Sequence, residues 1–144
     1  MSNKTPAAGI MVTVTQFVPA AADDGKSYTT ATVKLVGNAN GTVSQATPNG
    51  AIRVDRGAVV DLVFAMAPAS PETYYPVGIS FLGRNGGVGM DDFPARTVDA
   101  DAFNGMTLKV HDANVDGNLF NFKLIVQRQS DGAIGIIDPM INNA

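Results

Sequence analysis

Apolar and polar residues alternate along most of this chain. The clearest case is residues 118–127, where Phe120, Phe122, Leu124 and Val126 fall on one face. A period of two is the spacing of side chains on one face of a β-strand. No segment carries apolar residues at helical spacing over three turns. The pattern therefore predicts an all-β protein.

The alternation predicts seven to eight antiparallel strands, separated by turns rich in Gly, Pro and Asn. The segment 58–66 is apolar on both faces, which indicates a central strand. Regular strand spacing with such turns is typical of an immunoglobulin-like β-sandwich with Greek-key connections. The expected strands cover residues 10–18, 29–36, 52–54, 58–66, 76–82, 106–110, 118–127 and 132–138, with 42–44 as an alternative short edge strand.

Size and composition narrow the class of protein. The 144 residues form one domain, 1–144, and we expect residues 1–8 to be a loose N-terminal tail. There is no cysteine, which excludes disulfides and thiolate metal sites. The 10 basic residues form no cluster, so we expect no nucleic-acid partner. No apolar run approaches the roughly 18 residues of a membrane span, and no signal peptide is evident, so we expect a cytoplasmic protein.

A half-motif for calcium precedes the long alternating segment. Asp112, Asn114 and Asp116 stand at alternate positions before Gly117, and their oxygens are ligands that a hard cation accepts. The twelfth position, where a calcium loop needs Glu, is Lys123. The other interpretation is a tight turn, because Asn and Asp tolerate left-handed backbone and Gly supplies positive φ. Both interpretations remain open from the sequence.

The Gly-rich stretch 83–93 is the longest irregular segment. Arg84 and Asn85 precede several glycines, and backbone N–H groups in such loops can approach an anion. Asp91 and Asp92 follow and place negative charge where a phosphate would bind. These residues predict a binding loop at the tip of the domain rather than a phosphate site.

Tyr74 and Tyr75 lie beside a proline-rich loop. Adjacent tyrosines can stack on a sugar or anchor a protein contact. In an alternating strand, however, only one of them is buried, and the other lies at the surface.

Nothing in the chain predicts catalysis. His111 is the only histidine, and no serine stands in the context of an activated nucleophile. We therefore expect no catalytic residues and no cofactor.

The C-terminal residues 131–143 carry a distinctive ending, Asp138-Pro139 followed by Ile141. A turn such as that at Gly117, followed by an aromatic such as Phe120, is typical of the corner before the penultimate strand of a sandwich. The C-terminal ending, with the general strand plan, resembles the DP-EP family of small bacterial proteins and, more distantly, the AidA/PixA inclusion-body proteins. The resemblance implies an immunoglobulin-like sandwich and a bacterial or phage origin. It supplies no catalytic residues. Pro139 cannot donate to a β-ladder, so we expect Asp138 and Pro139 to end strand pairing or to lie at a sheet edge.

We expect a non-enzymatic protein with a structural or protein-interaction role. Only 16% of the residues are charged. Sparse charge leaves sheet edges weakly protected against pairing, so a homo-oligomer is the expected state. The alternative is a module that binds carbohydrate or calcium through loops at one end of the sandwich.

Overall fold

The computed structural model describes residues 5–20, 28–45, 51–67, 72–83, 93, 95–99, 107–114, 119–138 and 140–143. These residues form β-strands and connections and contain no helix, as the alternation predicts. Two sheets contain all of the strands. The strands are β1 (Ala7–Gln16), β2 (Thr30–Leu35), β3 (Val43–Ser44), β4 (Ile52–Val54), β5 (Val60–Met66), β6 (Tyr74–Gly83), β7 (Ala95–Asp99), β8 (Thr107–Asp112), β9 (Leu119–Arg128), β10 (Ile134–Ile137) and β11 (Met140–Asn143).

The first sheet has the order β2-β1-β5-β8-β7. The central strand is β5, as its two apolar faces predicted, and Leu62, Val63 and Phe64 are all buried. Strand β1 pairs antiparallel with β2 but parallel with β5.

The second sheet is built around β9. One edge of β9 pairs with β6 along its length, and the other edge pairs with β10 and then β11. Both short strands pair with β9 in the same register, β10 up to Ile137 and β11 from Met140. Strand β11 pairs in turn with β4, in parallel, and β4 with β3.

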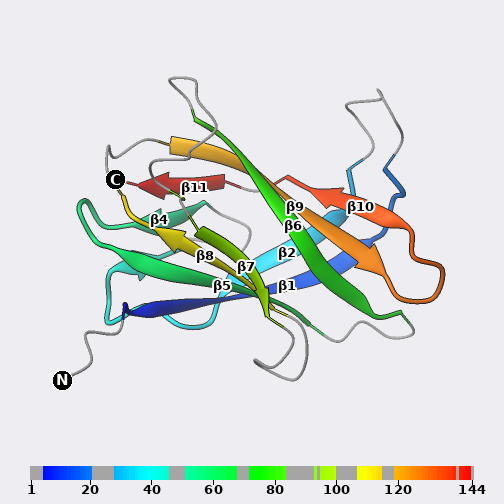
Figure 1. Cartoon of the computed structure of the whole chain (residues 1–144), viewed down its shortest axis with the longest axis horizontal. Coiled ribbons are helices and arrows are strands. Elements are labelled where there is room, and N and C mark those ends of the chain that lie inside the picture. The colour runs from blue at the N-terminus through cyan, green and yellow to red at the C-terminus, as the bar shows by residue number, and fades with distance from the viewer. Residues whose placement is uncertain are drawn as a thin grey trace.

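The two sheets enclose one core. Figure 1 shows the second sheet lying across the first. The rings of Phe64 on β5 and Phe122 on β9 are 5.4 Å apart between centroids, which places both sheets in contact. Phe93 is fully buried and stacks on Phe81 of β6 at 3.9 Å. The inward residues of β9, Phe120 to Val126 at every second position, are all buried, as predicted.

Three expectations were wrong. The described residues alone form eleven strands rather than seven to eight, because the alternation missed β7 and did not separate β10 from β11. The pairing is not wholly antiparallel, since β1–β5 and β11–β4 are parallel. The tail does not extend to residue 8, because β1 begins at Ala7 and Ala8 is fully buried. The described residues contain no helix long and apolar enough to cross a membrane.

Candidate functional site

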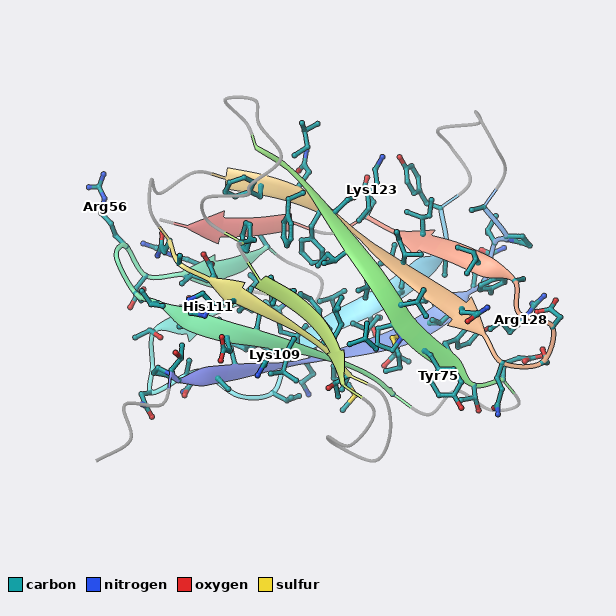
Figure 2. The ribbon with its side chains drawn as sticks, viewed as in Figure 1. Arg56, Tyr75, Lys109, His111, Lys123 and Arg128 are labelled. Atoms are coloured by element: carbon teal, nitrogen blue, oxygen red, sulfur yellow. The ribbon has the colours of Figure 1, made fainter. Side chains whose placement is uncertain are left out.

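The two adjacent tyrosines point to opposite sides of β6. Tyr74 faces inward, and its ring stacks on Phe17 with 5.4 Å between centroids. Tyr75 is half-buried on the outer face of the second sheet, where it is opposite Gln127 (Figure 2). The pair therefore does not offer two parallel rings to a sugar. Only Tyr75 is available to a partner.

The outer face around Tyr75 carries a group of apolar side chains. Ile125 on β9 lies between Gly78 on β6 and Ile136 on β10 in the strand register. Val77 is 37% exposed and Ile134 is 38% exposed. We call this group the outer-face cluster; its members are Tyr75, Val77, Ile125, Ile134 and Ile136. Exposed apolar groups of this kind mark contact surfaces when they are contiguous.

A β-bulge shapes the cluster at β6. The register shifts between Pro76 and Gly78, which leaves Val77 without a partner on β9. A β-carbon at Gly78 would lie 3.6 Å from Cδ1 of Ile125. Gly78 has no side chain of its own, and the Ile125 side chain lies over it at van der Waals distance.

The cluster is flanked by one cation and one anion on the face formed by β6, β9 and β10. Lys123 and Asp138 are both exposed, and the register of β10 and β11 places Asp138 beside Lys123. Within the described part of the chain they form no ion pair with each other. The Lys123 ammonium instead lies 5.8 Å from the centre of the Tyr28 ring. The β6–β9 register places Lys123 and Tyr75 on the same face of the second sheet, since Lys123 and Gln127, the partner of Tyr75, are four residues apart on β9.

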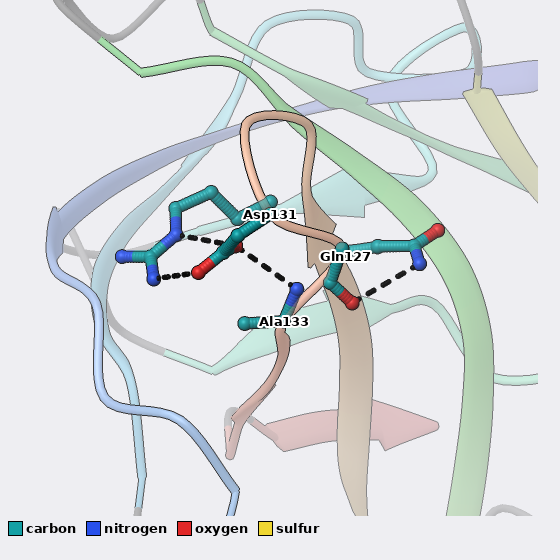
Figure 3. A network of polar contacts seen from close by, with 5 residues as sticks. Gln127, Asp131 and Ala133 are labelled. Atoms are coloured by element: carbon teal, nitrogen blue, oxygen red, sulfur yellow. Dashed lines mark hydrogen bonds and ion pairs between the residues drawn. The ribbon is translucent and has the colours of Figure 1, made fainter.

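The hairpin between β9 and β10 is fixed by a polar network (Figure 3). Arg128 donates from Nε and Nη2 to the Asp131 carboxylate at 3.0 and 2.6 Å. Ala133 N–H donates to the same carboxylate at 3.0 Å. The hydrogen bonds from Arg128 and then Ala133 lower the pKa of Asp131 from its ordinary 3.8 to about 2. The guanidinium also lies 4.4 Å from the Phe17 ring centre, so the hairpin is tied to the body of the domain.

The calcium half-motif forms a buried turn in its described part. Asp112 Oδ1 accepts a hydrogen bond from the Asn114 backbone N–H at 3.0 Å, and Asn114 has a φ of 50°. The Asn114 amide nitrogen donates to the carbonyls of Asp55 and Ala58 at 2.7 and 3.1 Å. This residue therefore fastens the end of β8 to the turn before β5. Asp116 and Gly117 lie outside the described residues.

Asn114 Oδ1 is buried and accepts no hydrogen bond in the part of the chain described here. No group of three or more acidic or histidine side chains stands at metal-binding distance within the same residues. The described geometry is thus that of a turn, with one buried oxygen left over.

His111 is paired with Asp61, not with the adjacent Asp112. Its Nδ1 is 2.9 Å from Asp61 Oδ1, across the β5–β8 ladder on the first sheet. The sequence did not reveal this partner, which is 50 residues away. The serines that the structure describes, Ser44, Ser80 and Ser130, lie on the second sheet or on its hairpin. The geometry therefore brings no serine described here to His111 as a nucleophile.

A shallow cleft opens between β2 and the end of β10. Its volume is about 280 Å³, and its lining includes Tyr28, Val33, Ile137 and Asp138. Asp138, predicted only as the end of a strand, thus belongs to the surface of a cleft as well. Ile141 lies in β11, where it pairs with Phe120 and Ile52.

The remaining candidates, Arg84, Asn85, Asp91, Asp92 and Pro139, fall outside the described residues. The sequence reasoning missed most of the outer-face cluster. A signal was present in the sequence, because apolar residues occupy outward-facing as well as inward-facing strand positions there: Ile134, Ile136 and Ile137, and likewise Leu124 and Ile125. An apolar residue at a position that would otherwise be polar and face solvent indicates that the second face of the strand is also buried or in contact with a partner.

No model of a known protein family matches this chain, and no curated protein is measurably similar to it.

Proposed function

We propose that this is a non-enzymatic interaction protein that self-associates through the outer-face cluster. The single observation that carries the proposal is the contiguity of Tyr75, Val77, Ile125, Ile134 and Ile136 on one face of the second sheet. Burying apolar surface is worth roughly 25 cal/mol per Å², so a cluster of this kind can drive association.

Three of the sheet edges, at β2, β10 and β6, are partly covered or irregular, which favours a face over these edges as the contact. The Gln45 side chain covers part of β2, because it accepts from Leu35 N and donates to Val33 O, each at 2.8 Å. The outer edge of β10 is covered by residues 20 and 29, whose N–H groups donate to Ile134 and Ile136. In β6, a proline and a bulge disturb the edge. Edge pairing, which sparse charge had suggested, is therefore the less favoured route.

At the level of the fold, we propose an immunoglobulin-like sandwich with Greek-key connections. The chain passes repeatedly between the two sheets, since β1, β2, β5, β7 and β8 belong to one and the other strands belong to the second. Such passage is typical of Greek-key sandwiches.

The test is sedimentation equilibrium of the wild type and two matched variants. Ile134→Lys places a charge inside the cluster and should shift the chain toward monomer. Val59→Lys adds the same charge at a residue that is 44% exposed on the first-sheet side of the molecule, just before β5, and should leave association unchanged. Equal association of both variants would contradict the proposal.

A second candidate function is calcium binding at the Asp112 turn. The observation that favours it is the buried Asn114 Oδ1, which has no hydrogen-bond donor among the described residues and lies next to a buried carboxylate. A carbohydrate site is the other form of this ligand-binding alternative, and the cleft beside Tyr28 and Asp138 is its best location. A rise in melting temperature with calcium, lost in Asp112→Asn, would favour the calcium form by linkage. No rise at millimolar calcium would exclude it.

A further inference from the structure

We propose that the partner on the outer-face cluster is a second copy of this chain, packed face to face about a two-fold axis that runs between β9 and β10, parallel to both. This inference rests on the self-association proposed above and specifies its geometry. Two copies related by such an axis bring the same surface of each into contact, as in an isologous dimer.

The strand register defines what this axis places in contact. Ile136 on β10 lies beside Ile125 on β9, and Asp138 follows beside Lys123. A half-turn about this axis brings β10 of the second copy over β9 of the first, and β9 of the second copy over β10 of the first. Ile125 of one copy then faces Ile136 of the second copy, and Lys123 faces Asp138 of the second copy.

Charge is the reason that a second copy fits this face. The face of β6, β9 and β10 holds one exposed cation and one exposed anion, side by side, and neither is in an ion pair within the described residues. The proposed axis turns them into two intermolecular pairs. An axis along β9 itself would instead oppose Lys123 to its own copy, which like charges disfavour.

The sheet geometry is compatible with this arrangement. An axis parallel to the strands keeps the strands of both copies nearly aligned, which is a common way for sheets to pack face to face, about 10 Å apart. Lysine and aspartate side chains that point toward each other can span such a gap.

The experiment uses two charge reversals, Lys123→Glu and Asp138→Lys, each in the full chain. Either reversal alone turns both intermolecular attractions into repulsions. Self-association should weaken by roughly thirtyfold, if each reversal changes two exposed pairs by about 1 kcal/mol. Thermal melting of each variant checks that the fold is kept, since both side chains are exposed.

Mixing the two variants is the decisive arm. In a mixed dimer, Glu at position 123 of one copy faces Lys at position 138 of the other, and the remaining native pair is intact. Titration of one labelled variant with the other should therefore restore association to within a few-fold of wild type.

Three outcomes overturn the inference. If either variant alone associates as tightly as wild type, or if the mixture does not associate, the two-fold arrangement is wrong while self-association still stands. If the wild-type chain is monomeric at every concentration, the inference and the proposed function are both wrong.

Discussion

Asn114 is the residue whose replacement tests the structure of the predicted calcium turn most sharply. Its amide nitrogen donates to the carbonyls of Asp55 and Ala58, which lie in the turn before β5. Each hydrogen bond contributes about 1 kcal/mol net, so their loss should cost roughly 2 kcal/mol. Asn114 also holds a left-handed φ of 50°, which an alanine adopts only at a further cost of about 1 kcal/mol.

A glycine and an alanine variant separate the loss of the hydrogen bonds from the cost of the left-handed backbone. Asn114→Gly removes the side chain but accepts the left-handed backbone, so it should lose roughly 2 kcal/mol of unfolding free energy. Asn114→Ala should lose roughly 3 kcal/mol, because the backbone strain is added. Asn114→Asp places an oxygen against two carbonyls and should be at least as damaging as the glycine.

The assay is urea denaturation of the three variants beside the wild type at pH 7 without calcium. For a domain of this size, 2 kcal/mol corresponds to a fall of roughly 4–8 °C in melting temperature. A glycine variant as stable as the wild type would refute the reasoning, because the two hydrogen bonds would then contribute nothing. A gain in stability with calcium that the wild type shows and the glycine variant lacks would show that the Asn114 side chain acts on the metal as well.

Three further predictions concern other parts of the molecule. Gly135→Ala should cost roughly 1–3 kcal/mol of stability in a denaturation experiment, since the new β-carbon would lie 2.5 Å from Thr29 Oγ1. Phe93→Ala should cost roughly 3–5 kcal/mol, because its buried ring stacks on Phe81; a loss below about 1 kcal/mol would contradict that stack. Asp131→Asn should lower stability slightly at pH 7 but not at pH 2: the pKa of Asp131 is lowered to about 2 by the neighbouring guanidinium, so its contribution is complete above about pH 4 and disappears as the pH falls toward 2.

The alternation of the sequence predicted the strands that face the core on one side. It also predicted the central position of β5, whose two faces are both apolar. These features follow from local spacing, because the strand period of two decides which residues are buried.

Pairing between distant strands could not be predicted in this way. The parallel contact of β1 with β5 joins segments about fifty residues apart, and alternation carries no information about a strand's neighbour or direction. The Asn114 amide likewise reaches carbonyls 56 and 59 residues away. The outer-face cluster depends on the same kind of contact, since Val77, Ile125 and Ile134 come from three strands.

The most direct test of self-association is light scattering of the wild-type chain over a dilution series. The account predicts a mass of twice the 14.9 kDa chain at high concentration, which falls toward the single-chain mass on dilution and in the Ile134→Lys variant. A mass of 14.9 kDa at every concentration would contradict self-association and leave the outer-face cluster without its proposed partner.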